Sequence, residues 1–142
     1  PDASSAPRTD MPDVSPRDAV MIAIAGGDTL IGDDAAPRDE RPQFSLHVPA
    51  FRLDRTPVTV EQFAAFVTET GYRTEAERFG TGAVFSPGLG QWRLIEGAFW
   101  RTPQGPDQPA APMDHPVTQV SWNDAAAFCE AYGLRLPSEF EW

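Results

Sequence analysis

The chain has 142 residues, of which 41% are hydrophobic and 11% aromatic, enough apolar material for the core of one ordinary domain. The net charge is −10, and all 11 basic residues are arginine. This balance argues against binding to nucleic acid or to an anionic membrane surface, because both need a cationic face. No apolar run approaches the ~20 residues that span a bilayer, so no membrane span is predicted.

Proline and glycine are numerous and scattered, with 15 and 11 residues respectively. This frequency of residues that interrupt helices and strands predicts a loop-rich fold with short elements rather than a helical bundle. Residues 1–18 are rich in Pro, Ser and Asp and lack an apolar pattern, which is typical of a flexible tail. We therefore expect the ordered part to cover residues 19–142.

Short strands are predicted at the start of the ordered part. Residues 20–24 form an apolar run, and 29–32 follow after the pair Gly26 and Gly27, so a hairpin is expected there. Apolar and polar residues then alternate over 44–48, which predicts a strand with one buried face. The pattern resumes at Phe51 after a proline.

Two helices are announced by their capping residues. Thr59 and Gln62 have the spacing of a capping box, and Gly71 is placed as the stop of the helix that follows. The second helix is expected over 122–132, with Ser121 as its cap. Trp122 and Cys129 share an apolar face of this helix, which predicts that both point toward the core.

No long periodic element is visible between residues 72 and 116, although this segment is rich in aromatic residues. A loop of this length is uncommon in a compact domain unless it serves a function. We expect Trp92, Trp100 and Arg101 to line a groove for an extended peptide. The alternative is that these aromatic residues form a small core beneath a long loop.

The last residues show the beginning of another helix. Ser138 and Glu141 again have capping-box spacing, so a helix is expected to start there. An isolated helical turn is unstable, because nucleation is costly. We therefore expect the chain to be the front part of a larger domain, completed by further sequence or by a second chain.

Catalytic machinery is not evident in the sequence. Cys129 has no basic neighbour that would lower its pKa, so it is interpreted as half of a disulfide or as a buried thiol, and less readily as a nucleophile. His47 and His115 have no carboxylates at ligand spacing and give a weak metal signal. The sequence contains no Gly-x-Ser-x-Gly, no Cys-x-x-Cys and no phosphate-binding glycine loop.

Four segments, in order, resemble motifs of the formylglycine-generating enzyme family, also called sulfatase-modifying factors. The segments are GYRTEAERFG at 71–80, GAFWRTPQGP at 97–106, HPVTQVSWNDA at 115–125 and GLRLPSEFEW at 133–142. The resemblance extends from about residue 20 to the end and identifies the chain as a member of this family, covering the front half of its domain.

The resemblance implies an α+β fold of the C-type-lectin-like kind, loop-rich, with short strands and two or three helices, and incomplete in this chain. It also implies an oxidoreductase that converts a cysteine in a Cys-x-Pro-x-Arg sulfatase peptide to formylglycine, using oxygen and copper. The copper cysteines and the ligands of a structural calcium belong to the second half of the family domain, so none maps onto this chain. Cys129 matches a position that is bridged in some members.

One departure from the family pattern concerns the substrate. Members that act on sulfatases tend to carry an acidic or polar pair after Phe-Gly, whereas this chain has Thr81 and Gly82. Thr81 is nevertheless taken as a substrate-binding candidate. The scaffold also implies two alternatives: a periplasmic homologue that oxidises the peptide-derived chromophore of the siderophore pyoverdine, or a non-catalytic lectin-like binding or scaffold domain. A periplasmic or secreted location is expected, with a cytoplasmic one as the alternative.

Overall fold

The computed structural model describes residues 20–142, so the predicted tail at 1–18 lies outside the described residues. Short strands and helices alternate along the chain, which confirms a mixed α+β architecture. The elements are β1 (Met21–Ile24), β2 (Gly27–Ile31), β3 (Phe44–Val48), β4 (Phe51–Asp54), α1 (Val60–Thr70), α2 (Glu75–Phe79), β5 (Thr81–Ser86), β6 (Gln91–Glu96) and α3 (Trp122–Ala131). The C-type-lectin-like form of this architecture stays a prediction.

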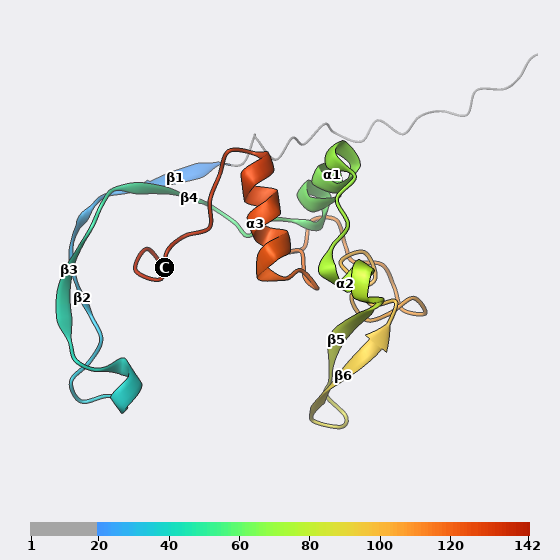
Figure 1. Ribbon diagram of the computed structural model, residues 1–142, viewed down its shortest axis with the longest axis horizontal. Coiled ribbons are helices and arrows are strands. Elements are labelled where there is room, and N and C mark those ends of the chain that lie inside the picture. Colours follow the sequence, from blue (N-terminus) through green and yellow to red (C-terminus); the bar gives the residue numbers. More distant parts are fainter. Residues whose placement is uncertain (1–19) are drawn as a thin grey trace, which may run out of the picture.

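The first four strands form one long, curved, two-stranded ribbon. β1 pairs with β4 and β2 pairs with β3, both antiparallel, so the first two strands run outward and the next two return (Figure 1). The predicted hairpin at Gly26 is therefore wrong, since the chain reverses only between β2 and β3. Gly26 instead lets the ribbon bend, because a Cβ there would lie 2.6 Å from the backbone nitrogen of Ala50.

The core is an aromatic cluster between α1 and α3. Its buried members are Val60, Phe63, Phe66, Trp100 and Phe128. The ring of Phe63 lies at its centre, with centroids 5.4 Å from those of Phe66 and Trp100 and 6.1 Å from that of Phe128. Burying a large apolar side chain contributes about 1.5–3 kcal/mol, so each member of this cluster stabilises the described part by an amount of that order.

The capping residues place both predicted helices as expected. Thr59 and Gln62 exchange reciprocal hydrogen bonds at the start of α1, and Gly71 ends it in a left-handed conformation with φ of 69°. Ser121 and Asp124 form the same arrangement on α3. A third capping box, of Thr74 and Glu77, starts the short helix α2, which the sequence analysis missed inside the supposed long loop.

The extended segment around Pro116 holds the start of α1 in place. The carbonyl of His115 accepts a hydrogen bond from the backbone N–H of Val60 at 2.9 Å. The N–H of Val117 donates to the carbonyl of Val58, also at 2.9 Å. This segment therefore satisfies one of the backbone donors that every helix N-terminus leaves without an intrahelical partner.

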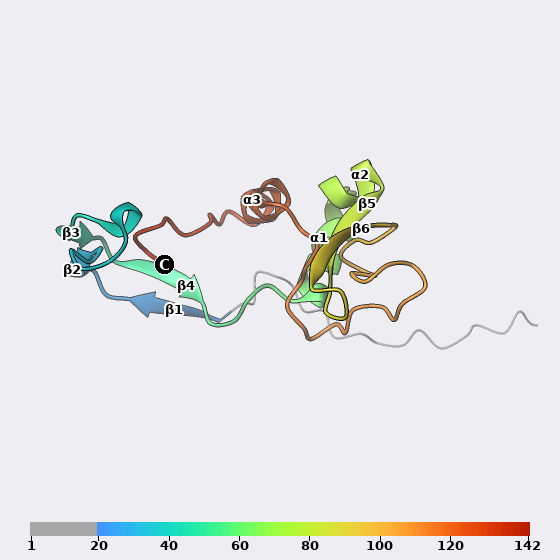
Figure 2. The ribbon, with the colours of Figure 1, turned by 90° about the horizontal axis from the view of Figure 1, so that it is seen from below.

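The ribbon stands apart from the aromatic core, and α3 lies between the two (Figure 2). After α3 the chain returns to the concave side of the ribbon, where Phe140 meets Phe44 edge to face with ring centroids 6.2 Å apart. The Glu141 carboxylate accepts from the Ser138 N–H at 2.8 Å, and the Trp142 N–H donates to the Ser138 carbonyl at 3.2 Å. These contacts form one hydrogen-bonded turn, and no helix is assigned within residues 138–142, so the helix start stays a prediction. Within residues 20–142 no helix is long and apolar enough to cross a bilayer.

Candidate functional site

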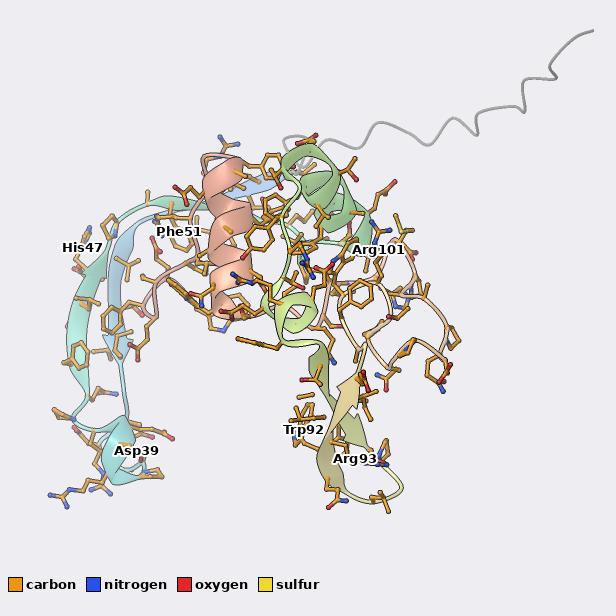
Figure 3. The ribbon with its side chains drawn as sticks, turned by 45° about the vertical axis from the view of Figure 1, so that its right-hand side comes forward. Asp39, His47, Phe51, Trp92, Arg93 and Arg101 are labelled. Carbon is orange, nitrogen blue, oxygen red and sulfur yellow. The ribbon has the colours of Figure 1, made fainter. Side chains whose placement is uncertain are left out.

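One face of the β5–β6 hairpin is exposed and is the candidate ligand-binding surface. Phe85 and Trp92 are directly opposed in the antiparallel register, and their rings meet with centroids 5.5 Å apart. Trp92 is 69% exposed, and Leu94 on the same face is exposed as well. Figure 3 shows the hairpin carrying Trp92 away from the body of the molecule. This face therefore offers an apolar platform to a ligand.

Thr81 begins β5 opposite Glu96 and is half-buried. The next residue, Gly82, is buried, and a Cβ there would lie 2.6 Å from both the Ala98 carbonyl oxygen and the Gln119 Oε1. A side chain at position 82 would therefore collide with its surroundings. This gives a structural reason why the second position of the expected polar pair is glycine in this chain.

Trp100 is placed differently from the prediction. Its side chain is 1% exposed and packs within the aromatic cluster against Phe63, so its ring does not line a surface groove. The alternative prediction, in which the aromatic residues of this segment form a small core, therefore holds for Trp100. Arg101 is exposed, with its Cζ 4.4 Å from the centroid of the Trp100 ring, a cation–π distance.

The predicted substrate residues do not converge on one pocket. Figure 3 shows Trp92 on the projecting hairpin and Arg101 beside the body of the molecule. Thr81 and Trp92 belong to the hairpin, whereas Trp100 and Arg101 belong to the loop that follows it. The hairpin face is thus the part of the prediction that remains open to a ligand.

Gln119, which the sequence analysis missed, joins the hairpin to the loop. Its backbone has a φ of 57°, rare for a residue other than glycine. Its side-chain Nε2 donates to the carbonyl of Ala83 on β5 at 2.8 Å and to the carbonyl of Pro103 at 3.0 Å. No sequence signal marks such a residue, because its partners are distant in sequence.

A buried carboxylate joins two of the family-like motifs. Asp124 is fully buried, and its Oδ1 accepts hydrogen bonds from the Tyr72 hydroxyl and the Glu75 N–H, both at 3.0 Å. Its Oδ2 accepts from the Ser121 N–H at 2.8 Å. The Asn123 amide also donates to the Glu75 carboxylate at 3.0 Å. The segments 71–80 and 115–125 are therefore one polar unit.

This polar unit also shifts the pKa values of its members. Burial, together with the hydrogen bond to Asp124, raises the pKa of Tyr72. Hydrogen bonds from Ser121 and Asn123 lower the pKa of Glu75. The Tyr72 shift follows first from burial and the Glu75 shift from hydrogen bonds within this unit, so both have a structural cause.

The face of α3 that is buried differs from the predicted one. Trp122 is 73% exposed, because the buried residues of this helix are Asp124 and Phe128, which lie four positions apart on another face. Cys129 is half-buried and packs against the core. Burial, and secondly the charge of Asp54, raises the pKa of its thiol. The described part holds it as a free cysteine, so its disulfide role stays a prediction.

The described residues do not supply a metal site. Within 20–142, no three His, Cys, Asp or Glu side chains gather as ligands. The copper site implied by the resemblance needs two cysteines, and the sequence has one, Cys129. The residues present therefore do not fit that site.

Comparison with known proteins shows the family. Residues 8–142 match the model of the sulfatase-modifying factor enzyme 1-like domain, so the chain belongs to this family. The formylglycine-generating enzyme of Thermomonospora curvata is 40% identical, with 94% of this chain and 51% of that protein covered. The formylglycine-generating enzyme of Streptomyces coelicolor is 39% identical, with 86% and 45% covered.

One mouse relative is named as inactive. The inactive C-alpha-formylglycine-generating enzyme 2 of Mus musculus is 40% identical, with 89% of this chain and 46% of that protein covered. The chain thus spans about half the length of the curated relatives it matches.

Proposed function

We propose that this chain is part of an oxidoreductase of the formylglycine-generating type, which oxidises a cysteine of a sulfatase peptide. The observation that carries the proposal is the 40% identity to the Thermomonospora curvata enzyme over nearly the whole chain. In this proposal copper and structural calcium are held by the part of the domain that the chain does not span. The described half contributes binding rather than chemistry.

The exposed hairpin face is the proposed contribution to peptide binding. An apolar platform of Phe85, Trp92 and Leu94 suits the hydrophobic side chains of an extended peptide, and aromatic residues dominate the energetics of such contacts. The base of the hairpin is held in place, because the Gln119 side chain hydrogen-bonds both to β5 and to the loop that follows the hairpin. A rigid platform lowers the entropy cost of binding.

A chimera tests the proposal. Residues 20–142 would replace the corresponding part of the Thermomonospora curvata enzyme, which then supplies the remainder of the domain. The chimera would be incubated with a Cys-x-Pro-x-Arg peptide, copper and oxygen. Conversion of the peptide –CH2SH group to –CHO, detected by mass spectrometry, is expected. A folded chimera that binds the peptide without converting it would reject the proposed activity.

Two variants of the chimera separate binding from chemistry. Trp92→Ala removes the centre of the platform, and a hot-spot loss of about 2 kcal/mol corresponds to a roughly thirtyfold higher KM with little change in kcat. Arg93→Ala is the matched control, since Arg93 opposes Val84 on the other face of the same hairpin. Equal KM values for both variants would remove the hairpin face from the binding site.

The second candidate is a non-catalytic binding domain of the same fold. The inactive mouse relative favours it, because this chain is as similar to that protein as to the active ones. The same peptide assay distinguishes the two candidates. Binding that is weakened by Trp92→Ala, together with no conversion by the chimera, supports the non-catalytic function.

A further inference from the structure

The two faces of the β5–β6 hairpin have different surroundings. Side chains alternate along β5, with Val84 buried and both Ala83 and Phe85 exposed. A Cβ at Gly105 would lie 2.9 Å from Ile95 Cγ2, so the buried face packs against the loop that follows the hairpin. The antiparallel register places each residue of β6 on the same face as its partner on β5. The hairpin therefore has one face against the body of the molecule and one face open.

The open face has one carboxylate, at its base. Glu96 is the last residue of β6, lies directly opposite Thr81 in the register and is exposed. Trp92 and Leu94 precede it at alternate positions, so all three side chains share this face. Glu96 is the only acidic residue of the hairpin, and the only basic one, Arg93, is on the other face. The open face is therefore an apolar strip that ends in a single negative charge.

The backbone at the base of the hairpin is held in place. The N–H of Gly97 donates to the carbonyl of Gly80 at 2.9 Å, directly beyond the opposed pair of Thr81 and Glu96. Directly opposed residues of an antiparallel pair have Cβ atoms about 4.5–5.5 Å apart. The Thr81 and Glu96 side chains therefore start from neighbouring points of one face, and both end in oxygen acceptors.

The Glu96 carboxylate is available, whereas those of the adjacent helix α2 are engaged. Glu75 accepts a hydrogen bond from the Asn123 amide at 3.0 Å. Glu77 accepts from the Thr74 hydroxyl at 2.8 Å, within its capping box. Within the part of the chain that the structure describes, no hydrogen bond or ion pair holds the Glu96 carboxylate. An available carboxylate beside an apolar strip suits a ligand that carries a cation next to apolar groups.

We propose that Glu96 binds the arginine of the Cys-x-Pro-x-Arg peptide, with the Thr81 hydroxyl as a second acceptor. This inference rests on the proposed function and names the contact that selects the peptide. A guanidinium donates two parallel hydrogen bonds to a carboxylate, a geometry that lysine does not supply. Trp92 lies four positions from Glu96, about 13 Å along the strand, so an extended peptide reaches both with residues four positions apart.

A binding assay that is independent of catalysis tests this contact. The probe is a fluorescein-labelled Cys-x-Pro-x-Arg peptide with serine in place of cysteine, and its anisotropy is followed as the Thermomonospora chimera is added. Glu96→Gln is expected to weaken binding roughly five- to tenfold, between the values for an exposed ion pair and a charge-assisted hydrogen bond. The variant should bind a peptide with glutamine in place of arginine as the unmodified chimera does. An equal Kd of the arginine peptide for both proteins would overturn the proposal.

Glu40→Gln is the matched control for the overall charge. It removes the same charge from an exposed glutamate in the loop between β2 and β3, on the opposite side of the molecule from the hairpin (Figure 1). The chain has a net charge of −10, so each lost carboxylate weakens the general attraction for a cationic peptide. We expect a change of less than about twofold for this control. A loss as large as that of Glu96→Gln would assign the effect to net charge and would overturn the proposal.

A charge reversal tests whether the contact is direct. Glu96→Arg is expected to bind a peptide with glutamate in place of arginine more tightly than the arginine peptide, which reverses the preference of the unmodified chimera. The melting temperature should stay the same in both Glu96 variants, because the side chain is exposed. A lower melting temperature of Glu96→Gln with an unchanged Kd would show that Glu96 pairs within the folded domain, and this result would overturn the proposal.

The outcome is separable from that of the proposed activity. Arginine-dependent binding through Glu96, without conversion of the cysteine peptide, rejects the oxidoreductase and supports the contact. Conversion of the cysteine peptide with equal KM values for Glu96→Gln and the unmodified chimera supports the oxidoreductase and overturns the contact. A folded chimera that does not bind the arginine peptide also overturns the contact.

Discussion

The Tyr72 hydroxyl donates to the Asp124 carboxylate at 3.0 Å, across 52 positions of sequence. Asp124 is at the same time the capping-box residue of α3 and an acceptor for the first N–H of α2. One buried carboxylate therefore holds two helices and an aromatic side chain in a single arrangement. These hydrogen bonds hold the segments 71–80 and 115–125 side by side in the fold.

Asp124→Ala should destabilise the chain by about 2–4 kcal/mol, because it removes a helix cap and leaves several buried donors unpaired. Tyr72→Phe removes one of these hydrogen bonds and should cost about 0.5–1.5 kcal/mol. Both values are measured by urea unfolding. The control Asp114→Ala, at an exposed position, should stay within about 0.5 kcal/mol. A cost for Asp124→Ala no larger than for this control would contradict the assigned role.

Gly82→Ala should destabilise the base of the hairpin. The added Cβ would lie 2.6 Å from the Ala98 carbonyl oxygen, a backbone atom that cannot move without disturbing the loop. A cost of about 1–3 kcal/mol is expected from such overpacking. Gly88→Ala, in the turn of the same hairpin, meets nothing within 4 Å and serves as the matched control. Thermal unfolding of both variants provides the measurement, and equal melting temperatures would show that the hairpin base is looser than described.

The Glu141 pair with Arg135 should persist to strongly acidic pH. The hydrogen bonds from Arg135, and secondly from the Ser138 backbone, lower the pKa of Glu141 from 4.5 to about 2. Since the folded-state pKa is depressed, the stabilisation is complete above pH 4.5 and is lost as the pH falls toward 2. An NMR titration of the Glu141 carboxyl carbon measures this midpoint.

Two arginine substitutions identify the source of the Glu141 shift. Arg135→Met should move the NMR midpoint upward toward 4.5, because it removes the largest cause of the shift. Arg101→Met changes an arginine that stacks on Trp100 instead, and it should leave the midpoint unchanged. An unchanged midpoint in Arg135→Met would assign the shift to the Ser138 backbone alone.

Cys129 should react slowly with thiol reagents at neutral pH, because only the thiolate reacts and its pKa is raised by burial and by Asp54. The pH profile of its reaction rate should therefore have a midpoint above that of a free cysteine. Asp54→Asn removes the second cause and should lower the midpoint without reaching that of a free cysteine. A midpoint unaffected by this change would place the Asp54 charge too far from the thiol.

The helices were predictable because their signals are local. The cap, the N3 partner and the C-terminal glycine of α1 all lie within the helix and its flanks, at Thr59, Gln62 and Gly71. A capping box of Thr74 and Glu77 also starts α2. This helix is not predicted from the sequence, because five residues are too few to show a helical periodicity. The α1 and α3 boundaries thus followed from hydrogen bonds that span three or four positions.

The strand pairing and the site were not predictable in the same way. Gly26 is a residue type that favours turns, which led to the predicted hairpin. The partner of β1 is instead β4, about thirty positions away, and no local sequence signal indicates this pairing. Trp100 is a residue type that is common in binding sites. Only its contact with Phe63 in the structure reveals that it belongs to the core. The buried face predicted for Trp122 is wrong, because α3 buries the polar Asp124 together with Phe128.

By itself, the sequence determined the ends of α1 and α3, the mixture of short strands and helices, and the membership of the family through its four motifs. Each of these depends on neighbouring residues or on a linear pattern. The tertiary structure decided which aromatic side chains are buried, how the ribbon pairs and which carboxylates are shared. The physical reason is that burial and pairing of buried polar groups are set by side chains from distant segments, as Asp124 and Tyr72 show.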